Sequence, residues 1–336
     1  MGQHNPAVES GGATGSVVDG AAAAAAAAWR VYTEDWDPAY GNAATFELDA
    51  PRDAVRVEQV EGHIPAGTVT PIPLAFIDGR RRAELSLWAE EAASGTRIPG
   101  LAGCYAVGAV TIRPNGPATY AGIRVGRLAI WGGGRTGDIA SRSGYRWTSD
   151  STPAVDPDQL LAQLQERMRQ AEGVLAIDAV EAGWNVVLDG PLNRIHGLHG
   201  FVAGYVKSHH RRILPPDDHA RVPDLDVGSR TAVYESGNDR YTCYIRVGRP
   251  GPAGSPWTGI ARLEFAAAPG INEVARRASL LAATLPRYAG AAHRDPRAPV
   301  NLSPVKNLEQ HLSRCMGRVE HATRAAREAV HLGSAA

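Results

Sequence analysis

Two aspartates in this chain each follow an apolar run and precede a glycine. The segments are Leu74-Ala75-Phe76-Ile77-Asp78-Gly79 and Val186-Val187-Leu188-Asp189-Gly190. A carboxylate at the end of a buried strand is costly unless a metal ion or a basic partner offsets its charge. Two such carboxylates indicate a two-metal centre that cleaves phosphodiesters. The alternative is a pair of ordinary turns, because Asp-Gly is a common turn dipeptide.

A third carboxylate is expected from the helix between these aspartates, which Pro157 and Asp158 open and which runs to about residue 181. Its apolar stripe consists of Leu161, Leu164, Met168, Ala171 and Leu175. At about 100° per residue, Glu172 lies about 70° from the centre of this stripe, whereas Glu166 lies roughly opposite. Glu172 is therefore the first choice and Asp178 the second. The alternative for Glu172 is a boundary residue that pairs with Arg169.

The composition sets limits on the class of protein. The chain has 336 residues, 35 of them basic and 35 acidic, so nucleic-acid binding would need a local patch. The three cysteines are far apart and fit no zinc spacing, which favours a reducing compartment. No apolar run approaches the ~18 residues of a membrane span, and the start has no basic region typical of secretion. We expect a cytoplasmic bacterial protein with no membrane segment.

The chain divides into a tail and one large domain. Residues 1–28 are mainly glycine, alanine and serine, end in eight alanines and offer little to bury. We expect this tail to be disordered, with residues 29–336 forming a single domain.

The pattern along that domain predicts an α/β fold. Strands are expected at 74–78, 83–89, 104–112, 120–130, 184–189, 231–235, 241–247 and 258–265, with turns at 80–82 and 114–117. After the helix at 157–181, further helices are expected at 272–285 and from 304 to 317 continuing towards 331. This order is that of a ribonuclease H-like mixed sheet flanked by helices. In such a sheet the first and fourth strands are neighbours, so Asp78 and Asp189 would meet.

Basic residues follow both aspartates. Lys207, Arg211 and Arg212 belong to a cluster at 207–212, and we favour phosphate contact over a merely solvated face. Arg80 and its two arginine neighbours could hold the scissile strand, or could only keep a hairpin turn soluble. Glu264 is expected to pair with Arg262 or Arg246.

Several segments together resemble the NurA nuclease family. They lie between residues 74 and 317 and are Phe76-Ile77-Asp78-Gly79, Val187-Leu188-Asp189-Gly190-Pro191-Leu192, Gly204-Tyr205-Val206-Lys207, Ile260-Ala261-Arg262-Leu263-Glu264-Phe265, Ala292-His293, Pro296-Arg297-Ala298-Pro299-Val300-Asn301-Leu302 and Leu308-Glu309. The resemblance implies a ribonuclease H-like fold, a homodimer, bound Mn²⁺ (or Mg²⁺), and DNA-end processing alongside a HerA-like hexameric ATPase.

The resemblance also implies site residues. The family's two strand aspartates fall on Asp78 and Asp189, its helix glutamate on Glu172 and its late histidine on His293. Without the family, His293 would be taken for a surface-loop residue. Archaeal members often have serine after each Asp-Gly, where this chain has Arg80 and Pro191. The family's tyrosine has only Tyr288 as a nearby candidate, and its role stays open.

Two functions of different classes follow. The first is a metal-dependent DNA nuclease, exonuclease or single-strand endonuclease, acting in repair or phage defence. The alternative is a non-catalytic subunit with a nuclease fold that binds DNA and regulates a translocase ATPase. Both aspartates and a plausible glutamate are present, which favours the enzyme; RNA remains possible as its substrate.

Overall fold

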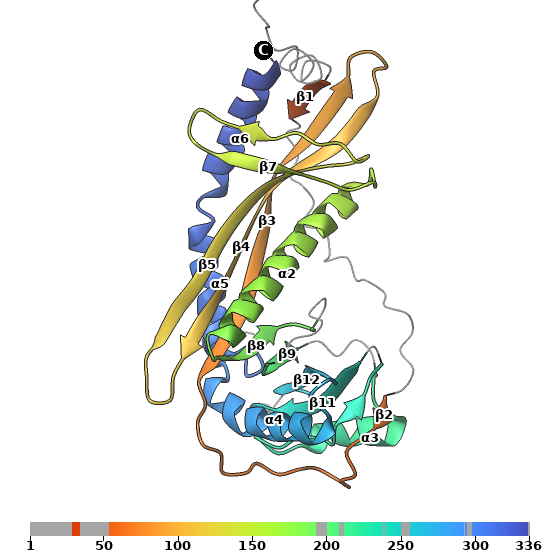
Figure 1. Ribbon diagram of the computed structural model, residues 1–336, viewed down its shortest axis with the longest axis vertical. Helices are drawn as coiled ribbons and strands as arrows, with labels where there is room; N and C mark the ends of the chain where they lie inside the picture. Colours follow the sequence, from red (N-terminus) through yellow and green to blue (C-terminus); the bar gives the residue numbers. More distant parts are fainter. Residues whose placement is uncertain are drawn as a thin grey trace, which may run out of the picture.

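The computed structural model describes residues 29–33, 54–192, 200–207, 212–237, 239–249, 256–291, 293 and 298–334. The expected disordered tail, residues 1–28, lies outside these residues. The molecule is elongated, with long strands running along most of its length (Figure 1). In the described part of the chain, no helix combines the length and the apolar character needed to cross a membrane.

One mixed sheet of 12 strands runs through the molecule in the order β2-β10-β11-β12-β9-β8-β3-β4-β5-β7-β6, with β1 paired to β3. Its strands are β1 (Trp29–Thr33), β2 (Val55–Arg56), β3 (Leu74–Glu91), β4 (Arg97–Ile112), β5 (Ala118–Trp131), β6 (Ile139–Ala140), β7 (Arg146–Ser151), β8 (Asn185–Asp189), β9 (Val202–Val206), β10 (Tyr234–Glu235), β11 (Arg240–Arg246) and β12 (Ile260–Ala266). The expectation of an α/β protein with a mixed sheet flanked by helices is confirmed.

The helices cover both faces of this sheet. They are α2 (Pro157–Glu181), α3 (Pro216–Arg221), α4 (Ile271–Thr284), α5 (Ser303–Cys315) and α6 (Val319–Ser334), with short 3₁₀ turns at Val222–Asp224 and Leu285–Tyr288. Figure 1 shows α2 slanting in the same direction as the long strands, while α5 and α6 follow one another on their other side. The helix predicted from Pro157 to about 181 is confirmed, with Asp156 as its N-cap.

The central strands bring the two aspartates together. β3, β4 and β5 are antiparallel neighbours, whereas β8 pairs in parallel with β3, and β9 with β8. Ile77 is in register with Leu188, so Asp78 and Asp189 occupy the next positions on adjacent strands. The expectation that these two strands are neighbours is confirmed.

Residues on β3 alternate between two cores, as a strand requires. Ala75 and Ile77 pack with residues of α2, whereas Leu74 and Phe76 pack with residues of α4 and α5. Continuing this alternation puts Asp78 on the α4/α5 face and Gly79 on the α2 face. The same two-residue period therefore decides which helix can reach each side chain near the site.

The turn predicted at residues 80–82 is wrong, because β3 continues through it as one strand of 18 residues. The three arginines alternate and each has a neighbour. Arg80 lies 4.0 Å from Glu309, Arg81 donates to Gln165 on α2, and Arg82 donates to the carbonyl of Gly317. Charge at three successive positions suggested a solvated turn, but helices on both faces of the sheet supply these side chains with partners.

The strand β4 begins at Arg97, seven residues before the start predicted from sequence. Its first half is rich in glycine, which weakened the strand pattern. A β-carbon on Gly100 would lie 2.5 Å from the Trp131 ring, and one on Gly103 would lie 2.6 Å from the Leu164 side chain. These glycines permit close packing within a strand instead of marking a loop.

The last helical stretch is two helices and not one continuous helix. Gly317 adopts a φ of 74°, and its N–H donates to the carbonyl of Arg314 at 3.0 Å. A left-handed glycine of this kind ends a helix. Arg82 and Arg127 both donate to the carbonyl of Met316, so the end of α5 is tied to the long strands.

Candidate metal centre

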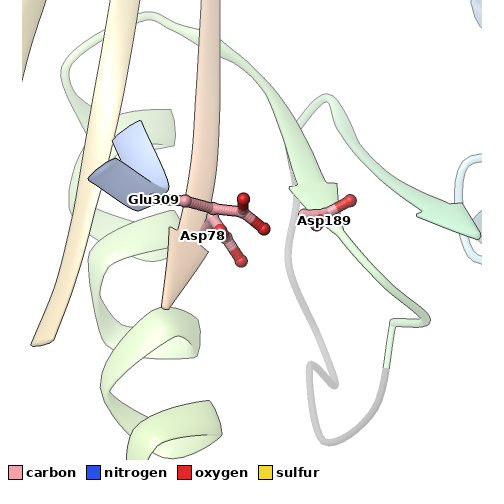
Figure 2. Close-up of side chains that lie close together, drawn as sticks. All are labelled: Asp78, Asp189 and Glu309. Atoms are coloured by element: carbon pink, nitrogen blue, oxygen red, sulfur yellow. The ribbon is translucent and has the colours of Figure 1, made fainter. Parts of the chain in front are cut away.

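Three carboxylates from three different elements converge. Asp78 from β3, Asp189 from the end of β8 and Glu309 from α5 each place an oxygen within 4.8 Å of the others. Figure 2 shows Asp78 and Glu309 side by side, with Asp189 across from them at the end of the neighbouring strand. Of the aspartate, glutamate, histidine and cysteine side chains in the described residues, these three are the group close enough together to hold a metal ion.

The two strands present their aspartates differently. Asp78 lies within β3, followed by a glycine in extended backbone, so the expected turn is absent there. Asp189 is the last residue of β8, and Gly190 turns the chain with a φ of 121°. Asp-Gly therefore forms a turn only at Asp189-Gly190, where the glycine adopts a backbone conformation that other residues rarely adopt.

The cluster is costly in the absence of a cation. Asp78 is 7% exposed, and its Oδ2 is buried without a hydrogen-bond partner among the described residues. Burial raises the pKa of Asp78 well above its ordinary range, and the charges of Asp189, Glu172 and Glu309 raise it further. A divalent cation would offset this concentration of negative charge.

The donor set fits a hard divalent cation. All three side chains offer carboxylate oxygens, which suit Mg²⁺, Mn²⁺ and Ca²⁺, and neither histidine nor cysteine belongs to the group. The buried Asp78 Oδ2 has no donor among the residues that the structure describes and is therefore suited to a metal. The chemistry of the residues supports a metal site but does not discriminate among these ions.

The structure leaves Glu172, the glutamate expected at this site, outside the three-carboxylate group. Its Oε1 lies against Gly79, where an added β-carbon would be only 2.5 Å away. It therefore turns towards the sheet, as its helical phase predicted, but from the α2 face. Asp78 and Asp189 follow the alternation of the opposite face, and α5 supplies the carboxylate there.

Glu172 is nevertheless electrostatically linked to the site. Burial raises the pKa of Glu172 from 4.5 to about 8; Arg169 lowers it, and Asp189 raises it again. Glu166 is partly exposed and accepts a hydrogen bond from Gln170. Asp178, the second choice, is also at the surface and pairs with Arg124.

No role was predicted for Glu309 from the sequence, although it is the last residue of one of the segments that resemble NurA. A signal was present in α5. Glu309 is the helix's single acidic residue and lies four positions after the buried Val305 and one after the buried Leu308. The helical-phase argument used for α2, if applied to α5, would have placed Glu309 at the edge of that helix's apolar stripe.

The remaining predicted residues occupy varied positions. Lys207 lies 2.7 Å from both carboxylate oxygens of Asp189, and Arg80 lies beside Glu309. Arg212 is exposed, while Arg211 lies outside the described residues. His293 is an exposed turn residue that is not part of the carboxylate group.

Two other expectations concern residues near the site. Tyr288 packs edge-on against Phe76, with ring centroids 5.1 Å apart, so its ring contributes to the core. Glu264 pairs with Arg262, as expected, and also accepts the backbone N–H of Leu192 at 3.0 Å. Arg246 instead donates to carbonyls of neighbouring loops, including Leu225 and Thr258.

Comparison with known proteins gives a distant likeness of fold. No protein-family model matches the sequence, and no curated protein matches it. Among solved structures, the fold is similar to the crystal structure of the NurA nuclease from Sulfolobus solfataricus, with a TM-score of 0.42 and 10% identity over 77% of this chain and 88% of that chain. A score of this size describes a distant similarity of shape, so the chemistry must come from the residues of the site.

The raised pKa of Glu172 predicts how stability depends on pH without metal. Between about pH 5 and 8 the folded state keeps a proton that the unfolded state has lost. The free energy of unfolding should therefore fall as pH rises, by up to about 1.4 kcal/mol per pH unit for one group. Glu172→Gln cannot titrate and should flatten this dependence, whereas Glu166→Gln should not.

The measurement is urea unfolding at several pH values from 5.5 to 8, in the presence of EDTA. Asp78 contributes a dependence of the same sign, so the Glu172→Gln profile should be flatter but not level. Parallel profiles for Glu172→Gln and the unmodified protein would show that Glu172 is not held in a buried, charge-repelling environment.

Proposed function

We propose that this protein is a metal-dependent nuclease that cleaves phosphodiester bonds in DNA. The observation that carries the proposal is the group formed by Asp78, Asp189 and Glu309, whose oxygens lie within 4.8 Å of one another. A cation bound there would act as a Lewis acid and lower the pKa of a water molecule. We take Mn²⁺ or Mg²⁺ as the cation, since oxygen ligands suit both.

The protein's own residues would position the substrate. Asp78, Asp189 and Glu309 would hold the cation, while Arg80, 46% exposed and 4.0 Å from Glu309, is available to contact a phosphate beside it. Arginine suits phosphate because its planar guanidinium donates two hydrogen bonds at once. Glu172 lies behind the sheet, where burial raises its pKa to about 8 and favours the protonated form.

The sheet order supports a finer assignment of the fold. β3, β4 and β5 are antiparallel neighbours, and the sheet continues on the other side of β3 with β8 and β9, both parallel to β3. This arrangement agrees with the ribonuclease H-like order inferred from sequence. We propose that class for the central sheet, with two of the metal ligands, Asp78 and Asp189, on its paired first and fourth strands.

The proposal extends to assembly through the NurA resemblance of the sequence. On that ground we expect a homodimer that works with a HerA-like hexameric ATPase in the cytoplasm, in DNA repair or phage defence. The mass in solution from light scattering, with and without such an ATPase, tests this part separately from cleavage. A monomer unaffected by the ATPase would contradict the assembly and leave the nuclease proposal intact.

The direct test of function is cleavage of labelled single- and double-stranded DNA by the purified protein. Cleavage should require Mn²⁺ or Mg²⁺ and stop on addition of EDTA. DNA binding without cleavage under every metal condition would instead favour the alternative, a non-catalytic DNA-binding subunit that regulates a translocase. The same assay with RNA determines whether the nuclease discriminates the sugar.

Arg80 should contribute to DNA affinity and to its salt dependence. Arg80→Gln should reduce the slope of log affinity against log salt by about one unit, because one fewer counterion is released. Arg146→Gln is the matched control, since Arg146 is 70% exposed on β7, which β4 and β5 separate from β3 in the sheet. Filter binding in Ca²⁺ over a range of salt concentrations measures both; equal slopes would exclude phosphate contact by Arg80.

A further inference from the structure

Lys207 is held as a fixed cation beside the carboxylates. It follows β9, and its Nζ lies 2.7 Å from both Asp189 oxygens and donates to the Asn301 Oδ1 at 3.0 Å. Its side chain is 19% exposed, whereas Asn301 is completely buried. An ammonium with acceptors from two separate segments is far more restrained than an ordinary surface lysine.

The position of Lys207 follows from the same alternation that places the carboxylates. Tyr205 and Ala203 on β9 pack in the core on the α4/α5 face, and Lys207 is the next residue of that period. The Tyr205 hydroxyl donates to the carbonyl of Val300 at 2.8 Å, which ties down the segment that carries Asn301. Lys207 therefore approaches Asp189 on the face where Asp78 and Glu309 gather.

The balance of charge leaves room for one divalent cation. The three carboxylates of the group carry a formal charge of −3 when ionised, and two basic side chains, Lys207 and Arg80, contact members of the group. One divalent cation would bring the total formal charge to +1. A second, about 3.5–4 Å from the first, would raise it to +3 beside an ammonium that already lies on Asp189.

We propose that Lys207 takes the place of a second metal ion, so that each chain binds a single divalent cation on Asp78, Asp189 and Glu309. This inference rests on the proposed metal-dependent nuclease and replaces the two-ion site expected from the sequence. The lysine supplies three hydrogen-bond donors and one fixed positive charge. Facing the substrate, it would pair with a phosphate oxygen that a second metal would otherwise contact.

The test counts bound metal ions without requiring cleavage. The full-length protein, freed of metal with EDTA and then dialysed, is titrated with Mn²⁺; electron paramagnetic resonance measures the free ion and calorimetry the stoichiometry. We expect one Mn²⁺ per unmodified chain and two per Lys207→Met chain, because the substitution removes the charge and frees the Asp189 oxygens. Lys207→Arg, which keeps the charge, should bind one.

Lys306→Met is the matched control, because Lys306 is the chain's only other lysine and the change in net charge is the same. It should bind one Mn²⁺. Thermal melting checks that each variant is folded, and Lys207→Gln, whose amide can still donate to Asn301, replaces Lys207→Met if that variant is not.

The outcomes separate this inference from the proposed function. Two Mn²⁺ ions of comparable affinity on the unmodified chain would overturn the role of Lys207 and leave the nuclease proposal standing. One ion on both the unmodified and Lys207→Met chains would show that the lysine does not exclude a second cation. That result would also overturn the role of Lys207 and leave the nuclease proposal standing. No Mn²⁺ on the unmodified chain would overturn the metal-dependent nuclease and this inference together.

Discussion

Asp78→Asn is expected to abolish metal-dependent cleavage while making the metal-free protein more stable. The Asp78 carboxylate is buried, and one of its oxygens has no hydrogen-bond partner in the described part of the chain. Burial and neighbouring carboxylates raise its pKa. An amide removes that charge at nearly the same volume, so the metal-free melting temperature should rise by a few degrees. A metal ligand is lost at the same time.

Metal binding provides the second readout for Asp78→Asn. Mn²⁺ at about 100 times its dissociation constant should stabilise the unmodified protein by about 2.7 kcal/mol, since it binds only the folded state. Asp78→Asn should lose most of this gain. The combination of a more stable metal-free protein and an inactive enzyme cannot result from unfolding.

Asp189→Asn should also abolish cleavage, but with the opposite effect on metal-free stability. Asp189 is the partner of Lys207, so its neutralisation leaves a largely buried ammonium without a counter-charge. The melting temperature should fall. Asp178→Asn is the control for both, because Asp178 is exposed on α2 and pairs with Arg124 of β5; it should retain full activity. Substantial cleavage by either site variant would refute the site.

Glu309→Gln is expected to lower the cleavage rate by at least about 100-fold. Loss of residues that merely orient metal ligands already costs 10- to 100-fold in many metalloenzymes, and Glu309 offers an oxygen within 4.8 Å of both aspartates. The Mn²⁺ affinity should fall in parallel. Glu320→Gln on α6 is the control, since Glu320 is 69% exposed and pairs with Arg318.

Glu309 and Glu172 can be ranked by the same assay. Glu309 belongs to the carboxylate group, whereas Glu172 lies on the other face of the sheet against Gly79. Glu309→Gln should therefore reduce both activity and Mn²⁺ affinity more than Glu172→Gln does. If Glu172→Gln had the larger effect on Mn²⁺ affinity, the ligand set would have to include α2 in place of α5.

Local patterns in the sequence were sufficient to locate several elements. The helical period and the Pro157 start defined α2, and the apolar runs before Asp78 and Asp189 defined the first part of β3 and all of β8. The adjacency of those two strands also followed, because it depends on element order. Such features are encoded within a few residues or in the sequence of elements along the chain.

The course of β3 beyond Asp78 depended on the tertiary structure. Three successive arginines resemble a solvated turn when read locally, but α2 and the end of α5 lie on opposite faces and give each arginine a neighbour. The glycine-rich start of β4 was hidden for a similar reason. Its strand character comes from the close approach of Trp131 and Leu164, which no local pattern records.

The pairing of Asp78 with Asp189 could be inferred from the sequence, because parallel neighbours in a sheet place equivalent residues side by side. The sequence could not show which glutamate completes the group, since α2 and α5 each carry a glutamate at the edge of an apolar stripe. Only the packing of α2 on one face and α5 on the other, with the alternation of β3 directing Asp78 towards α5, brings Glu309 into the group and leaves Glu172 behind the sheet. The contact of Lys207 with Asp189 likewise joins residues 18 positions apart, on strands whose pairing fixes their distance.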